Sequence, residues 1–295
     1  MSITAAMVKD LREKTAAGMM DCKKALTECD GDMEKAVDWL RQKGLSKAAK
    51  KAGRATSEGL VGFEVSADGK LGAAVEVKCE TDFVARGDKF QGFVKDLTAQ
   101  VMKSDYADND ALLAAPFIAD AAQTVKEALD GTIATTGENM GIGRFARMEL
   151  TAGSAGQIAG YLHSNGKLAV LVEVKAESEA AASSEAFHDL TKNVAMQIAA
   201  ASPLAVSAEG LDPELIERER EVYRQKAREE GKPEQIIEKI AEGAVKKYCK
   251  EVCLLDQLYI RDDKMTINDL VKGVSKTLGE TISVVRFVRI QLGAE

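Results

Sequence analysis

The sequence predicts an α+β protein made of an N-terminal helical bundle, a duplicated sheet-and-helix core and a helical insertion. Three observations predict this class. Apolar residues near the N-terminus follow the helical period. A pattern of strands and helices occurs twice at a fixed spacing, and its second copy is longer by about 45 residues of charged, helical sequence.

Residues 1–44 predict three short helices joined by glycine-containing turns. Asp21 is the expected N-cap of the second helix and Asp32 that of the third. The loop between the first two helices is expected to leave Met19 and Met20 side by side, which suits either an adaptable contact surface or core filling. The basic, alanine-rich residues 45–54 predict a solvated helical linker.

The first copy of the repeat begins with a hairpin. Asp68-Gly69 predicts a type I′ turn, and residues 71–78 predict a half-buried strand with Glu76 on the face opposite the apolar residues. A helix is then predicted from an apolar stripe, and residues 144–150 predict a third strand. The stripe consists of Phe90, Phe93, Leu97 and Val101.

The same pattern returns further along the chain. The turn, strand and helix recur 97 residues later, with Asn165-Gly166 as the turn, and the third strand recurs 142 residues later as 286–292. Each copy is predicted to be a three-stranded antiparallel sheet backed by helices, so the core should have two lobes.

The extra residues of the second copy predict a helical hairpin. Asp212-Pro213 is expected to begin one helix, and Gly231-Lys232-Pro233 to separate it from the next. Sparse apolar positions favour a coiled-coil-like projection, which could serve as a spacer or as a contact arm. The expected domains are 1–54 (helical domain with linker), 55–152 (first lobe), 153–206 with 264–295 (second lobe) and 207–263 (insertion).

Composition narrows the class of function. Apolar residues make up 45% and charged residues 29%, and the net charge of −7 argues against a dedicated nucleic-acid binder. Five cysteines, an odd number, favour free thiols in a reducing compartment. The sequence has no signal-peptide pattern and no apolar run of about 18 residues, so we expect a cytoplasmic protein that does not bind membranes.

Enzymatic functions find little support in the sequence. His163 and His188 lack a serine or cysteine partner in a nucleophile pattern. The glycines in residues 141–146 precede a strand instead of joining a strand to a helix, so they do not match a dinucleotide-binding turn. We therefore expect no catalytic residues, no metal site and no cofactor.

One short stretch, Thr81-Asp82-Phe83-Val84, lies where a strand gives way to a helix. Phe83 is expected either to pack as a hydrophobic staple at the start of the helix or to contact a partner. In the second copy these positions hold Ser178-Glu179-Ala180-Ala181. A staple should occur in both copies, whereas a contact residue need occur in only one, so the comparison favours contact.

Over essentially its whole length, the sequence resembles elongation factor Ts, the guanine-nucleotide exchange factor of elongation factor Tu. The resemblance is carried by four stretches. They are residues 8–26, Thr81-Asp82-Phe83-Val84, Gly231-Lys232-Pro233 and residues 250–257. The family architecture thus implied is a ubiquitin-associated-like (UBA-like) three-helix domain, a two-lobed α+β core and a coiled-coil insertion.

The resemblance also implies a function and a set of contact residues. The chain would promote GDP release from elongation factor Tu, binding both its GDP-bound and nucleotide-free forms. Thr81, Asp82, Phe83 and Val84 would enter the partner near its magnesium site. The N-terminal domain would add a second contact, made by Arg12, Met19 and Met20. Homodimerisation is left open, and no direct nucleic-acid contact is expected.

Two other functions remain open at this stage. The N-terminal bundle alone would suit a ubiquitin-binding adaptor. The basic residues 47–54 would suit an RNA-binding protein, whose affinity should fall steeply with salt.

Overall fold

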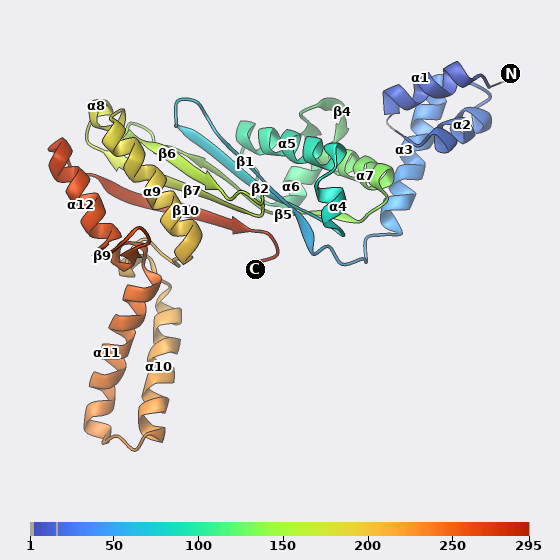
Figure 1. Cartoon of the computed structure of the whole chain (residues 1–295). Helices are drawn as coiled ribbons and strands as arrows, with labels where there is room; N and C mark the ends of the chain where they lie inside the picture. Colours follow the sequence, from blue (N-terminus) through green and yellow to red (C-terminus); the bar gives the residue numbers. More distant parts are fainter. Residues whose placement is uncertain (1–2, 16, 295) are drawn as a thin grey trace.

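The computed structural model describes residues 3–15 and 17–294, and it confirms the α+β class (Figure 1). Three N-terminal helices lie at one end of an elongated molecule, and two antiparallel sheets with their covering helices form the middle. A pair of long helices projects from the far end of this core.

The N-terminal helices α1 (Ala5–Thr15), α2 (Met19–Glu28) and α3 (Met33–Ala49) pack around one small apolar core. Its buried residues are Val8, Leu11, Cys22, Ala25, Leu26 and Ala36. Asp32 caps α3 as predicted, since its carboxylate accepts a hydrogen bond from the Lys35 amide at 3.1 Å.

The prediction that Asp21 caps the second helix is wrong. Gly18 is the N-cap of α2, and Asp21 lies inside the first turn, where its carboxylate pairs with Lys43 at 2.8 Å. Met19 and Met20 therefore belong to the helix itself and not to a loop.

Helix α3 continues to Ala49, so it includes half of the predicted linker, and it packs along α7 (Val125–Thr136) of the first lobe. Arg41 of α3 lies 2.6 Å from the carboxylate of Glu127, which also closes the capping box at the start of α7.

The first lobe has the predicted three-stranded antiparallel sheet, in the order β1-β2-β5. The predicted stripe of α5, from Phe90 to Val101, is buried against this sheet. The elements of the lobe, besides α7, are β1 (Glu58–Val65), β2 (Leu71–Cys79), α4 (Asp82–Ala85), α5 (Asp88–Lys103), α6 (Asn109–Ala114), β3 (Pro116–Phe117), β4 (Asp120–Thr124) and β5 (Met140–Glu149).

The second lobe repeats the first, with its sheet in the order β10-β7-β6. Its elements are β6 (Ala155–Leu162), β7 (Leu168–Ala176), α8 (Glu179–Ala182), α9 (Glu185–Ala201), β8 (Leu258–Tyr259), β9 (Asp262–Thr266), α12 (Ile267–Leu278) and β10 (Ser283–Gln291). The duplication extends beyond the predicted unit, because the β8–β9 hairpin and α12 match β3–β4 and α7 at the spacing of 142 residues.

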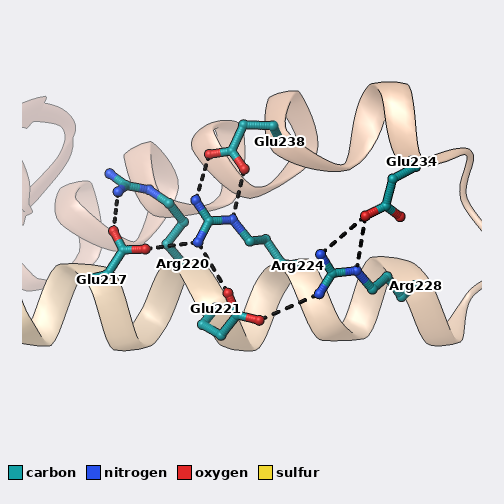
Figure 2. Close-up of polar contacts among 7 residues, drawn as sticks. All are labelled: Glu217, Arg220, Glu221, Arg224, Arg228, Glu234 and Glu238. Carbon is teal, nitrogen blue, oxygen red and sulfur yellow. Dashed lines mark hydrogen bonds and ion pairs between the residues drawn. The ribbon is translucent and has the colours of Figure 1, made fainter.

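The extra residues form the expected helical pair, α10 (Pro213–Glu229) and α11 (Glu234–Val252), flanked by the short 3₁₀ helices η1 (Ala208–Gly210) and η2 (Leu254–Asp256). Arginine–glutamate ion pairs join the two helices; Arg224, for example, contacts Glu238 of α11 at 2.7 Å (Figure 2). The domain boundaries remain a prediction. Because β8–β9 belongs to the repeat, we would end the insertion before Leu258 and not at 263.

The two sheets pack face to face through one shared apolar cluster. Its buried members come from both lobes and are Val61, Ala74, Met148, Leu150, Ile158, Ala169, Leu171 and Ile290. Strand β2 is central in its sheet and has helices on one face and the other sheet on the opposite face. The prediction of a half-buried strand is therefore wrong: Glu76, expected on a solvent face, is buried, as is its counterpart Glu173.

The hairpin turns also hold the lobes together. Val61 of the first lobe donates its amide hydrogen to the Gly166 carbonyl at 2.7 Å, and Ile158 of the second lobe donates to the Gly69 carbonyl at 2.6 Å. Both hairpins are confirmed, but the predicted type I′ turn is wrong. Only the glycine of each pair has a positive φ, 66° at Gly69 and 69° at Gly166. Each glycine is the fourth residue of a turn that its amide closes, by donating to the Ser66 carbonyl at 2.9 Å and to the His163 carbonyl at 2.8 Å respectively.

Candidate interaction site

The stretch Thr81–Val84 forms the start of α4, the single helical turn that follows β2. Thr81 is its N-cap, and its Oγ1 accepts a hydrogen bond from the Val84 amide at 3.3 Å. Asp82 occupies the first helical position and pairs with Arg86 one turn later, at 3.1 Å.

Phe83 projects from this turn into solvent. Its exposed fraction is 84%, the largest of any exposed large apolar residue in the part of the chain that the structure describes. A hydrophobic staple requires a buried ring, so the staple interpretation is wrong. Val84 instead packs against the core of the first lobe and Ala85 is buried, so the turn is anchored by these two residues.

A carboxylate from another element holds the turn in place. Glu138, between α7 and β5, accepts hydrogen bonds from the Thr81 amide at 3.0 Å and from the Thr81 hydroxyl at 2.7 Å. The Cys79 thiol donates to the Thr81 carbonyl at 3.2 Å. Burial, followed by the nearby Glu138 carboxylate, raises the pKa of this thiol to about 11, so it remains a protonated donor at neutral pH.

The second lobe contains the same turn without the aromatic ring. Ser178 donates its amide to Glu280 at 2.9 Å and its hydroxyl to the same carboxylate at 2.5 Å, and it caps α8. Ala180 stands where the first lobe has Phe83, and it too is exposed. The fold therefore uses the junction twice but places a large apolar side chain on only one of them.

Arg12, Met19 and Met20 lie together on the N-terminal helices, around a pocket of about 420 Å³ between α1 and α2. The two methionines are 59% and 74% exposed. Ile3 and Val8 add apolar lining, and the cations Lys9 and Lys23 lie at the same pocket. Helices α1 and α2, which line this pocket, lie at one end of the molecule, apart from α4 (Figure 1).

Sequence reasoning found both groups of candidate residues but missed Glu138. A signal was present, because Gly137-Glu138 recurs as Gly279-Glu280 at the same spacing as the third strand. The repeat alone could not say that this glutamate points at Thr81.

Residues 3–15 and 17–294, which the structure describes, contain little that would suit other kinds of site. No group of three or more histidine, cysteine, aspartate or glutamate side chains there could hold a metal ion. His163 hydrogen-bonds with Tyr161 at 2.9 Å, and His188 with Gln157 at 2.7 Å. Within those ranges, no helix is both long enough and apolar enough to span a membrane.

An exposed aromatic ring beside a carboxylate, on a turn held by several hydrogen bonds, is typical of a protein that binds another protein. Comparison with known proteins specifies the family. The family model for elongation factor Ts matches residues 80–294. Elongation factor Ts of Lawsonia intracellularis is 59% identical over 295 residues, which is 100% of both chains.

Two further relatives agree. Elongation factor Ts of Nitratidesulfovibrio vulgaris (strain DP4) is 62% identical over 295 residues, covering 100% of this chain and 97% of the relative. That of Desulfovibrio desulfuricans is 55% identical over 294 residues, covering 100% and 99%. The chain belongs to the elongation factor Ts family, and its role is in the elongation stage of protein biosynthesis.

Proposed function

We propose that this chain promotes the release of GDP from elongation factor Tu by disturbing the magnesium and phosphate site of that partner and stabilising its nucleotide-free state. The observation that carries the proposal is Phe83, an 84% exposed ring on a turn whose backbone is anchored on both sides. Membership of the elongation factor Ts family supplies the partner.

Within this proposal the four residues of the turn have different tasks. Phe83 enters an apolar site on the partner, and Asp82 offers its carboxylate as a hydrogen-bond acceptor near the magnesium site. Thr81 caps the turn, and Val84 anchors it to the first lobe while the remainder of its side chain stays accessible. Asp82 pairs with Arg86 on the surface, and a surface pair of this kind is weak enough to exchange for a partner contact.

Burial of Phe83 alone would not suffice for efficient exchange. Transfer of one phenylalanine from water contributes roughly 1.5–3 kcal/mol, or about one to two powers of ten in an equilibrium. We therefore propose a second contact through Arg12, Met19 and Met20, whose pocket combines apolar lining with a basic rim. An acidic, amphipathic surface on the partner would fit it.

The finer architecture belongs to the same proposal. The small core shared by α1, α2 and α3 supports a UBA-like domain, and the paired α10 and α11 support a coiled-coil arm. The buried positions Ile237, Ala241 and Val245 recur at four-residue spacing along α11, as expected for the inner face of a helical pair.

The proposal is tested by measuring the release of labelled GDP from elongation factor Tu with and without the chain. We expect faster release and a stable complex with the nucleotide-free partner. Because coupling between two ligands is reciprocal, GDP should weaken this complex by the same factor by which the chain weakens GDP binding. A complex whose affinity does not respond to GDP would contradict the proposal.

A further inference from the structure

We propose that Glu138 is a positioning residue: it holds the α4 turn in the orientation in which Asp82 and Phe83 reach the partner. This inference rests on the proposed exchange function and adds a residue outside the contact stretch. Glu138 would act through Thr81 and would itself touch neither nucleotide nor magnesium.

The turn cannot hold its own orientation. Helix α4 has only four residues, Asp82–Ala85, and a single helical turn is unfavourable by itself. It needs partners for the free amides at its start, and Thr81 and Glu138 provide them. The carboxylate of Glu138 accepts both the amide hydrogen (3.0 Å) and the hydroxyl hydrogen (2.7 Å) of Thr81, and charge-assisted bonds of this kind are stronger and more directional than neutral ones.

The next residue adds a second attachment. The Asn139 amide donates to the Glu80 carboxylate at 2.6 Å, and the Asn139 side chain donates to the Arg54 carbonyl at 2.7 Å. Glu80 also pairs with Arg54 at 3.4 Å. Residues 138 and 139 therefore fix both the start of α4 and the segment that leads in from the N-terminal helices.

This second attachment is specific to the lobe that carries Phe83. Asn139 corresponds to Thr281 in the second lobe, and Glu80 to Glu177. Among the residues that the structure describes, no hydrogen bond between Glu177 and Thr281 matches the one between Glu80 and Asn139. The Ser178–Glu280 attachment, in contrast, reproduces Thr81–Glu138 closely. The copy that presents the ring therefore has an attachment through residue 139 that the other copy lacks.

The duplication provides a matched control for the experiment. Both Glu138 and Glu280 are half-buried. Each accepts two hydrogen bonds from the N-cap residue of its lobe's short helix, Thr81 of α4 or Ser178 of α8. Replacing either with glutamine removes one acceptor and the charge, so the two variants should lose similar amounts of thermal stability. Only Glu138→Gln disturbs the turn that carries Phe83.

The experiment measures GDP release from elongation factor Tu, together with thermal unfolding, for Glu138→Gln and Glu280→Gln. Small displacements of a contact group lower rates strongly, so we expect Glu138→Gln to slow release about three- to tenfold and Glu280→Gln less than about twofold. Combined with Asp82→Ala and Phe83→Ala, the Glu138→Gln change should cost less than about a further twofold, because the groups it positions are gone.

Thr81→Ser provides a conservative check. Ser178 already makes these bonds in the second lobe, so Thr81→Ser should keep the bonds to Glu138 and slow release less than Thr81→Val, which lacks the hydroxyl. If Glu138→Gln does not fold, Thr81→Val and its match Ser178→Ala replace the pair, with the same expected difference between the lobes.

Two results would overturn the inference. One is an equal loss of exchange in Glu138→Gln and Glu280→Gln, which would make the attachment purely structural. The other is a full Glu138→Gln effect in the chain that lacks both Asp82 and Phe83. A different failure, in which Phe83→Ala itself leaves GDP release unchanged, would refute the proposed function and the inference with it.

Discussion

Replacing Met19 and Met20 together with serine should weaken association with elongation factor Tu while leaving the free protein stable. The two side chains lie in the first turn of α2, and the structure leaves 59% of one and 74% of the other exposed. Neither belongs to the buried core of the N-terminal helices. Surface substitutions away from a core usually change the free energy of unfolding by less than about 0.5 kcal/mol.

The expected loss of affinity follows from the exposed surface. Full burial of one methionine contributes about 1.5–3 kcal/mol, so covering the exposed parts of both contributes about 2–4 kcal/mol. That corresponds to a loss of affinity of about 30- to 700-fold. Calorimetric titration of the variant into nucleotide-free elongation factor Tu measures it directly.

A control within the same helix separates binding from folding. Leu26→Ala removes a fully buried side chain of the bundle and should lower the melting temperature of the N-terminal helices. The contact hypothesis is refuted if the methionine variant loses several degrees of melting temperature as Leu26→Ala does, or if it binds the partner with unchanged affinity.

Two further predictions concern the helical insertion and the core. Replacing residues 213–252 with a short glycine/serine loop should leave the two lobes folded, because a β-bridge between Ala205 and Cys253 joins the two ends of the helical pair. Loss of a cooperative unfolding transition would contradict this prediction. For Glu173, burial raises the pKa, but hydrogen bonds from Thr151 and Arg286 outweigh it, and the net pKa lies below the ordinary value. The unfolded chain therefore takes up the proton first, so this contribution to stability is complete at neutral pH and is lost as the pH falls through the folded-state pKa. Glu173→Gln should remove that part of the acid dependence in denaturant unfolding, and an unchanged dependence would show that Glu173 does not contribute.

Periodicity and internal repetition predicted most of the fold. The spacings of 97 and 142 residues identified two copies of a hairpin, a helix and a third strand. Each three-stranded sheet in the structure consists of such a hairpin and its third strand. The predicted insertion, 207–263, ends inside the β8–β9 hairpin, because its strands of two and five residues are too short to produce a strand pattern. The structure shows its relation to β3–β4, since both hairpins occupy the same place in their lobes, 142 residues apart.

The error at Glu76 and Glu173 comes from contacts between distant residues. Glu76 and Glu173 looked solvent-facing because a polar residue in an alternating strand normally points to water. In the fold, that face meets the other lobe: the amide of Gly293, which follows β10 of the second lobe, donates a hydrogen bond to the Glu76 carboxylate at 2.7 Å. The type I′ turns were wrong for a local reason: Ser66 pairs with Leu71 and His163 with Leu168, so each hairpin loop has four residues instead of the two that a type I′ turn requires.

The candidate site was predictable in part. Comparison of Phe83 with Ala180 argued from sequence alone that the fold does not need the ring, and the exposure of both positions agrees with it. Met19 and Met20 were candidates for contact or for core filling because they are adjacent in the sequence, whereas Arg12 came only from family resemblance, since nothing local links it to the methionine pair. Glu138 acts on Thr81 across 57 residues of sequence, a pairing that no local pattern encodes.

The central claim is that Phe83 is an exposed contact residue which promotes GDP release, and Phe83→Ala tests it most directly. Loss of the exposed Phe83 ring should cost well under about 1 kcal/mol of stability. The ring of Phe90 in α5 is fully buried, so Phe90→Ala should cost about 3–5 kcal/mol. Leu162→Ala, at another exposed apolar residue, is the surface control.

The decisive measurement is the rate of GDP release from elongation factor Tu stimulated by Phe83→Ala, with thermal unfolding recorded on the same preparation. We predict a variant as stable as the wild type whose stimulated release is slower by one to two powers of ten, the equilibrium worth of burying one aromatic side chain. A stable Phe83→Ala protein that stimulates release at the wild-type rate would contradict the account.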